Sequence, residues 1–217
     1  MLNIQRFVCN MFQENCYVVS DSSKECVIID CGAFFNEEKK AISDYIDNNK
    51  LTPIHLLCTH GHVDHNFGNK FIYDTFGLKP RVSLKDEQLM NNLNTQAEAF
   101  IGKVVDEKFP TIGKELSENE TIKFGNHTLS IIPTPGHTPG SVFLYCSEES
   151  LAFSGDTLFQ MSIGRTDLAL GNFDDIMLSL AHIAKVLPPE TTILPGHGSK
   201  TNMKDEIKYN PYLKHHD

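Results

Sequence analysis

The sequence predicts an α/β domain that spans residues 1–217. Short apolar segments of strand length alternate with longer segments whose apolar residues recur at helical spacing. Four of the apolar segments run directly into glycine-containing loops that carry histidine or aspartate, an arrangement typical of sites at the strand ends of an α/β sheet. A length of 217 residues, with 40% hydrophobic and 22% charged residues, is ordinary for one folded domain.

The first half of the chain predicts two strands, a helix, a third strand and a second helix. Residues 15–20 and 25–30, separated by the polar turn DSSK, are expected to form a hairpin. Residues 37–49 are amphipathic and predict a helix, and residues 53–59 predict a buried strand. Residues 64–77, DHNFGNKFIYDTFG, predict a second helix because their large apolar residues recur at helical spacing before a terminal glycine.

The second half of the chain repeats the order of strand and polar loop. Residues 86–118 contain less regular helical patterns, and we expect a helical insertion that covers one side of the molecule and shapes access to a site. HTLSIIPT then leads into PGHTPGS, LAFSGD into TLF, and TTILP into GHGSK. Each of these three strands is therefore expected to end at a polar side chain.

The charge distribution argues against several classes of partner. The formal net charge is −9, and no run of Lys or Arg supplies the clustered cations that bind nucleic-acid phosphates. The first residues lack a secretory pattern, and no apolar run approaches the roughly 18 residues that span a bilayer. We therefore expect a cytoplasmic protein that binds neither nucleic acid nor membrane. The six cysteines show no CxxC spacing and are expected to be buried, reduced thiols.

The loops carry a set of side chains suited to metal binding, including the stretch THGHVDH. The candidate ligands are His60, His62, Asp64, His65, His137, Asp156 and His197. Taken singly, each has an ordinary interpretation as a turn former, a cap or an exposed loop residue. Their recurrence at corresponding strand ends favours a metal site, because unrelated loop residues have no reason to share that chemistry. Imidazole and carboxylate without thiolate suit zinc, iron or manganese, and seven ligands match two ions.

Taken in order, THGHVDH, PGHTPGS, FSGDTLF and PGHG resemble the metal-binding motifs of the metallo-β-lactamase superfamily, over nearly the whole chain. The resemblance implies a four-layer αββα sandwich. It also implies two divalent metal ions, with Zn²⁺ expected first and Fe or Mn as alternatives. By the roles of the matching positions, one ion is held by His60, His62 and His137 and the other by Asp64, His65 and His197, with Asp156 bridging them.

Within that superfamily, FSGDTLFQMSIGRTDLALGNF resembles the short bacterial members of the glyoxalase II-like branch, the hydroxyacylglutathione hydrolases. The implied reaction is hydrolysis of a small acyl thioester such as S-lactoylglutathione by a hydroxide that the two metals share, with Asp64 orienting it. A thiolate leaving group, whose conjugate acid has a pKa of about 8.5, needs little general-acid help. Longer glyoxalase II enzymes carry a helical extension that helps to bind glutathione, whereas 20 residues follow His197 here, so another thiol carrier stays open.

Two other functions stay open. The GRTD segment also resembles persulfide dioxygenases, in which a single iron would bind His60, His137 and Asp156. The second alternative is a non-enzymatic metal-binding scaffold, although a scaffold has no need for all seven ligands. A β-lactamase is not expected, because those enzymes act outside the cytoplasm and enter through a signal peptide.

Several residues outside the ligand set are candidates for supporting roles. Arg165 can grip a substrate carboxylate, with a structural pair to Asp167 as the alternative. Asp30 is a candidate to fix a histidine tautomer, or else a turn residue that closes the hairpin. A solvated helix face is the interpretation of three lysines that recur every fourth residue, Lys200, Lys204 and Lys208.

Overall fold

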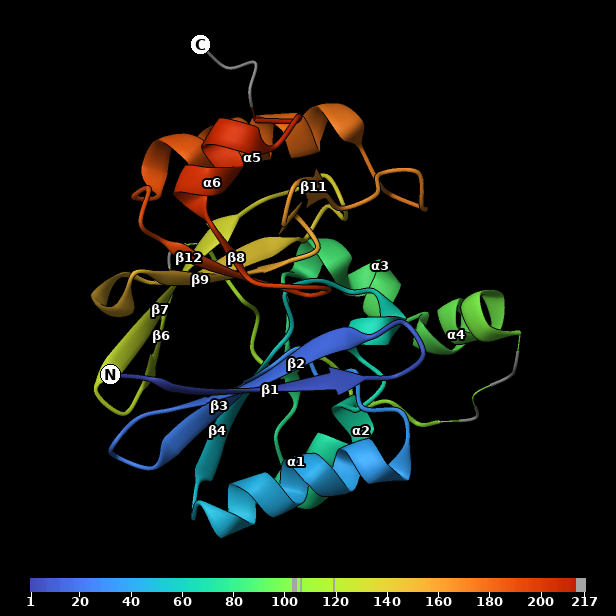
Figure 1. The fold of residues 1–217 in the computed structure, drawn as a ribbon. Coiled ribbons are helices and arrows are strands. Elements are labelled where there is room, and N and C mark those ends of the chain that lie inside the picture. The colour runs from blue at the N-terminus through green and yellow to red at the C-terminus, as the bar shows by residue number, and fades with distance from the viewer. Residues whose placement is uncertain (103–104, 106, 119, 214–217) are drawn as a thin grey trace.

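Two β-sheets face each other at the centre of the molecule, and helices cover the outer face of each sheet (Figure 1). The computed structural model describes residues 1–102, 105, 107–118 and 120–213. The layers follow the order α, β, β, α, so the predicted α/β class and the four-layer sandwich are confirmed.

The first sheet has the strand order β1-β2-β3-β4-β5. Its strands are β1 (Asn3–Cys9), β2 (Glu14–Ser20), β3 (Glu25–Ile29), β4 (Thr52–Leu57) and β5 (Pro80–Arg81). The predicted hairpin is the antiparallel pair β2-β3, in which Tyr17 lies opposite Ile29. The sequence does not predict β1, because this edge strand is mostly accessible to solvent and has no buried apolar run.

The second sheet has the order β13-β12-β9-β8-β7-β6, beside a two-stranded ribbon of β10 and β11. Its strands are β6 (Thr121–Phe124), β7 (His127–Pro133), β8 (Val142–Cys146), β9 (Leu151–Gly155), β12 (Thr192–Pro195) and β13 (Thr201–Asn202), and the ribbon consists of β10 (Leu158–Phe159) and β11 (Ser162–Ile163). β7 and β9 are both antiparallel to β8, and β12 is parallel to β9. β7, β9 and β12 therefore end at the same edge of the sheet.

Helices cover the outer faces of both sheets, and others lie at one side of the molecule (Figure 1). They are α1 (Asn36–Asn48) and α2 (Asn69–Phe76) on the first sheet, α5 (Phe173–Val186) and α6 (Met203–Tyr209) on the second, and α3 (Glu87–Met90) and α4 (Leu93–Ile101) at the side; single 3₁₀ turns occur at Val63–His65, Leu84–Asp86 and Ser147–Glu149. Ile28 of β3 and Ile42 of α1 are fully buried in one cluster, and each contributes about 1.5–3 kcal/mol by leaving water. A separate core between the two sheets contains Phe124, Leu144 and Phe153.

The predicted helix of residues 64–77 is wrong in its first part. The chain forms a 3₁₀ turn at Val63–His65, and α2 begins only at Asn69. The interruption arises because Asn66 donates from Nδ2 to the carbonyl oxygens of His60 and His62, at 3.1 and 2.6 Å, which folds the loop back on itself. Apolar periodicity does not report such a contact, so it placed the start of the helix too early.

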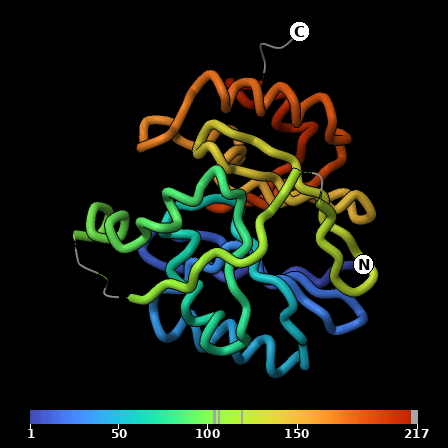
Figure 2. Tube along the Cα trace, turned by 180° about the vertical axis from the view of Figure 1, so that it is seen from behind, coloured from blue at the N-terminus to red at the C-terminus, as the bar shows by residue number. Residues whose placement is uncertain are grey.

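Among the described residues of the predicted helical insertion 86–118, the last helix ends at Ile101. Residues 107–118 form a loop that runs across the back of the molecule from the first sheet toward the second (Figure 2). Gly113 and Leu116 donate their N–H groups to the carbonyl oxygens of Pro80 and Val82, at 2.8 and 3.1 Å. This part of the insertion therefore satisfies its backbone against the edge of the first sheet instead of forming a helix.

All six cysteines are free and buried, as the sequence predicts. Cys9, Cys16 and Cys31 pack as small apolar side chains between the first sheet and α1. None of the helices in the described part of the chain has both the length and the apolar character needed to cross a membrane.

Candidate metal centre

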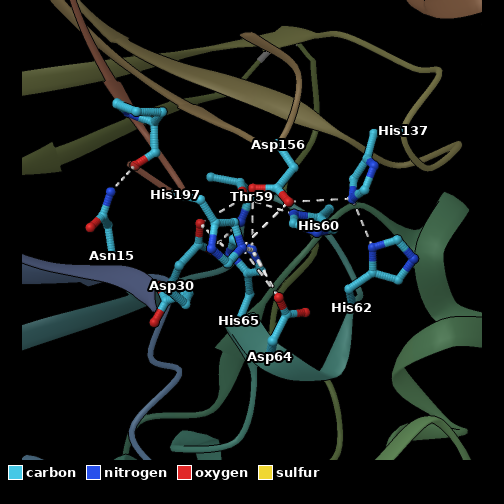
Figure 3. A network of polar contacts seen from close by, with 12 residues as sticks. Asn15, Asp30, Thr59, His60, His62, Asp64, His65, His137, Asp156 and His197 are labelled. Carbon is cyan, nitrogen blue, oxygen red and sulfur yellow. Dashed lines mark hydrogen bonds and ion pairs between the residues drawn. The ribbon is translucent and has the colours of Figure 1, made fainter. Parts of the chain in front are cut away.

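The loops that follow β4, β7, β9 and β12 bring all seven predicted ligands together (Figure 3). Three overlapping groups have ligand atoms that lie within 4.8 Å of one another: His60, His62 and His137; His60, His65 and Asp156; and Asp64, His65 and His197. The sequence placed these residues at four separate strand ends. Because the two sheets face each other, the four strand ends meet and form a single site.

Asp156 lies between two groups of histidines. On one side, His62 Nδ1 lies 2.8 Å from His137 Nε2, and Asp156 Oδ2 lies 3.6 Å from that same Nε2. On the other side, His65 Nε2 lies 3.3 Å from His197 Nε2, and Asp156 Oδ1 lies 3.3 Å from His65 Nε2. The side chains thus form two neighbouring groups that share one carboxylate.

Two buried atoms that face the cluster, His60 Nε2 and Asp156 Oδ1, lack a hydrogen-bond partner in the described structure, as does His65 Nδ1 on the side of Asp30. A buried polar atom left unpaired costs about 1–3 kcal/mol, and more when the group is charged. A cation between the two groups would satisfy the two atoms that face the cluster. Nitrogen and oxygen donors without a thiolate also suit zinc, iron or manganese. The residues present therefore fit divalent metal ions.

Backbone carbonyl groups outside the cluster fix the tautomers of two histidines. His137 Nδ1 lies 2.7 Å from the carbonyl oxygen of Arg165, and His197 Nδ1 lies 3.0 Å from that of Phe12. A carbonyl oxygen only accepts, so each Nδ1 carries the proton. Each Nε2 then presents its lone pair to the cluster, which is the form that binds a metal.

Asp30 supports two further histidines from outside the cluster (Figure 3). Its carboxylate accepts from the backbone N–H and the hydroxyl group of Thr59, both at 2.7 Å, and its Oδ2 lies 3.2 Å from His65 Nδ1. Thr59 Oγ1 in turn lies 3.1 Å from His60 Nδ1. These contacts favour the supporting role for Asp30 over that of a hairpin-turn residue.

The charges in the site prepare it for a cation. Burial lowers the pKa of His62 to about 4 and lowers the pKa of His60 well below its usual range, so both imidazoles are neutral at neutral pH. Burial also lowers the pKa of His65, but Asp156 and Asp64 outweigh burial and leave that pKa raised. The carboxylates therefore favour positive charge at this position, which a metal ion supplies.

Gly155 is required for the placement of Asp156. Its φ of 48° lies in the left-handed region, and a Cβ at this position would lie 2.3 Å from Thr59 Oγ1. The glycine in the motif SGD therefore lets β9 approach the loop that follows β4.

A cavity of 440 Å³ opens over the cluster. Five of the candidate ligands line it: His62, Asp64, His137, Asp156 and His197. Its other walls are mainly apolar, from Phe12, Phe100, Phe159, Ile163 and Leu168. A small molecule can reach the cluster through this opening.

The sequence profile of the metallo-β-lactamase superfamily matches residues 9–197. The chain belongs to this superfamily. It is 33% identical to the hydroxyacylglutathione hydrolase GloC of Haemophilus influenzae, over 98% of this chain and 98% of that protein. The solved structure of the B3 metallo-β-lactamase BLEG-1 has a TM-score of 0.86 at 32% identity, covering 98% of this chain and 99% of that one. TTHA1623, solved in a di-iron-bound form, has a TM-score of 0.83 at 30% identity, covering 96% and 100%.

Asp86 lies outside the four superfamily motifs, at the start of the predicted insertion. Its carboxylate accepts from the backbone N–H groups of Gly61 and Gly140, at 2.8 and 2.6 Å, and from the Thr138 hydroxyl at 2.7 Å. It therefore ties the ligand loop after β4 to the ligand loop after β7. Burial raises its pKa by more than these three donors lower it. A single acid before a helical segment is usually an exposed cap, so the sequence offered no signal for it.

The guanidinium group of Arg165 pairs with the carboxylate of Asp167. Its Nε and Nη2 lie 2.7 and 2.8 Å from the two carboxylate oxygens of Asp167, and both side chains are exposed. The structure therefore shows the structural pair, whereas a substrate contact by Arg165 stays a prediction. Three exposed lysines are not among the described residues that line the cavity: Lys200, Lys204 and Lys208.

Proposed function

We propose that this chain is a binuclear metal-dependent hydrolase of acyl thioesters, with Zn²⁺ as the metal. The observation that carries the proposal is the position of Asp156, whose carboxylate lies 3.6 Å from His137 Nε2 in one histidine group and 3.3 and 3.6 Å from the Nε2 atoms of His65 and His197 in the other. One of the carboxylate oxygens is buried without a hydrogen-bond partner among the described residues. A shared carboxylate between two sets of imidazoles suits two ions better than one.

The ligand assignment follows the two groups. One ion would be held by His60, His62 and His137 and the other by Asp64, His65 and His197, with Asp156 common to both. When bound, two divalent ions lower the pKa of water from 15.7 to about 7 and polarise an acyl oxygen. Imidazole and carboxylate ligands are accepted by zinc and also by iron, and the similar protein TTHA1623 holds two irons.

We propose that Asp64 contacts and orients the reacting water. Its carboxylate lines the cavity and lies 3.2 Å from His197 Nε2. Burial raises its pKa, but His65 and His197 outweigh burial and leave the pKa lowered, so the carboxylate is ionised at neutral pH. It can accept a hydrogen bond from the attacking water and direct a water lone pair at the acyl carbon.

The absence of a separate acid favours a thioester over an amide or an ester. Among the described residues that line the cavity, Asp64 and Asp156 are the only carboxylic acids, and both belong to the cluster. A thiolate, whose conjugate acid has a pKa of about 8.5, leaves without a proton from the protein. The similarity to GloC, a hydroxyacylglutathione hydrolase, over 98% of each chain supports the same substrate class.

The first test combines elemental analysis with three assays on protein purified without added metal. The assays measure hydrolysis of S-lactoylglutathione and simple acyl thioesters, oxygen uptake with glutathione persulfide, and hydrolysis of a chromogenic cephalosporin. Two equivalents of metal with thioester turnover are expected, and a chelator should abolish that turnover. His62→Ala should also abolish it, whereas His182→Ala, at an exposed histidine of α5, should not.

Other outcomes would replace the proposal. One equivalent of iron with oxygen uptake that survives His62→Ala would indicate a persulfide dioxygenase. Turnover of the cephalosporin alone would indicate a β-lactamase, the activity of the similar BLEG-1. Bound metal without any of the three activities would leave the non-enzymatic scaffold.

A further inference from the structure

A second groove adjoins the cavity over the metal cluster. It has a volume of 460 Å³ and lies between α3, α4 and the loop of residues 168–170. It shares three lining residues with the first cavity: His62, Phe100 and Leu168. A substrate whose reacting carbonyl lies at the cluster can therefore extend directly into this groove.

The groove offers an apolar surface. Its walls include Leu89, Ala99 and Phe100 from the helices, and it has no Asp, Glu, Lys or Arg among its described lining residues. The amide of Gln96 is already used, because its Oε1 accepts from Val63 and its Nε2 donates to Gly61 and Leu89. The groove also contains the exposed polar side chains of Gln88, Asn92 and Thr95, so its apolar surface comes from Leu89, Ala99, Phe100 and the segment of residues 168–170.

The cavity over the cluster has the same character at its rim. Phe12 and Phe100 form an edge-to-face pair with ring centroids 6.4 Å apart, and both rings are exposed. Leu170, which lines the adjoining groove, is exposed as well. Exposed large apolar side chains gathered at one site mark a surface that an apolar ligand covers.

The described residues that line the two spaces contain a single Lys or Arg side chain, that of Arg165. Its guanidinium already forms the two hydrogen bonds to Asp167, at 2.7 and 2.8 Å. A charged carrier such as glutathione, with two carboxylates and an ammonium group, would therefore meet apolar walls and a cation that is already paired. The lining favours an uncharged arm.

We propose that the preferred substrate is a thioester with an uncharged, apolar arm, and that this arm lies in the groove between α4 and residues 168–170. The inference rests on the proposed thioester hydrolysis and specifies its substrate class. Ala99 is a specificity-determining position, because its small side chain on α4 leaves the groove open. The arm belongs either to the acyl group or to the thiol, and the two sources are distinguished by experiment.

The test compares kcat/KM for four substrates with the metal-loaded protein. They are acetyl-N-acetylcysteamine as the parent, hexanoyl-N-acetylcysteamine with an apolar acyl arm, the acetyl thioester of hexanethiol with an apolar thiol arm, and S-lactoylglutathione. Each buried methylene contributes about fourfold in kcat/KM, so one of the two six-carbon substrates should exceed the parent at least about tenfold. It should also exceed S-lactoylglutathione, and its identity assigns the arm.

Two matched variants locate the arm. Ala99→Trp fills the groove and should reduce the ratio of the six-carbon substrate to the parent to about one. Glu98→Trp places the same side chain at the neighbouring exposed position, which lines neither space, and should keep the ratio. Equal kcat/KM for the parent and both six-carbon substrates, a preference for S-lactoylglutathione, or an unchanged ratio in Ala99→Trp would each overturn the inference.

A binding measurement separates this inference from the proposed function. The thioether S-hexyl-N-acetylcysteamine has no scissile carbonyl, and calorimetry should show that it binds to the wild type and to Glu98→Trp but at least tenfold more weakly to Ala99→Trp. This result with no hydrolysis of any thioester would reject the proposed reaction and keep the groove assignment. Thioester hydrolysis with equal thioether affinity in all three proteins would keep the reaction and reject the groove.

Discussion

Replacing Asp86 with alanine is expected to destabilise the protein by about 3–5 kcal/mol. The carboxylate is fully buried and accepts hydrogen bonds from Gly61, Gly140 and Thr138. Bonds to a charged acceptor contribute about 1.5–3 kcal/mol each, so the three amount to about 4.5–9 kcal/mol. Burial raises the pKa of Asp86, which means that desolvation of the charge offsets part of this sum.

Urea unfolding of the metal-free protein, followed by circular dichroism, measures this loss without a contribution from metal binding. Glu87→Ala is the matched control, because Glu87 is an exposed acid at the next position. Asp86→Asn should fall between the two, since the amide keeps one carbonyl oxygen but turns an NH₂ group toward a donor. Metal affinity, measured by competition with a chromogenic chelator, should fall as well, because Asp86 ties together two ligand loops.

An unfolding free energy for Asp86→Ala within about 0.5 kcal/mol of that for Glu87→Ala would refute this reasoning. It would mean that the N–H groups of Gly61 and Gly140 find other partners when the carboxylate is removed. A loss of stability with unchanged metal affinity would keep the energetic argument but would reject the link to the ligand loops.

Three further changes test other contacts. Asp30→Asn removes the charge 3.2 Å from His65 Nδ1, so chelator competition should show about 10–100-fold weaker binding of one metal equivalent, and equal affinity would reject the support by Asp30. Gly136→Ala should lower the free energy of unfolding by more than about 2 kcal/mol, because its φ is 139° and a Cβ would lie 2.3 Å from the backbone nitrogen of Ile176; an unchanged urea midpoint would show that the loop relaxes. Burial raises the pKa of Asp21, but the hydrogen bonds that its carboxylate accepts outweigh burial and leave the pKa lowered. This stabilisation is present above the ordinary aspartate pKa of about 3.9 and is lost as the pH falls through the folded-state pKa, so Asp21→Asn should flatten the acid side of a stability curve, and a slope equal to that of the wild type would contradict it.

The elements that the sequence predicted well are those with a local pattern. The hairpin β2-β3 carries buried apolar runs, and β4 is buried at its end, at Leu56 and Leu57. The strands before His137, Asp156 and His197 end at glycine-containing loops. Elements held by distant contacts were missed or misplaced. The edge strand β1 lacks an apolar run, and the start of α2 depends on bonds from Asn66 that periodicity cannot report.

The same division holds in the site. The sequence alone pointed to the seven candidate ligands and to the strand before each, because side-chain chemistry and spacing are local properties. Only the tertiary structure decided which backbone carbonyls orient His137 and His197, since every residue has a carbonyl group and the fold selects those of Arg165 and Phe12. The tertiary structure also assigned the guanidinium of Arg165 to Asp167. It alone placed the apolar groove beside the cluster, because a cavity is made by segments that meet in space and leaves no pattern in any one of them.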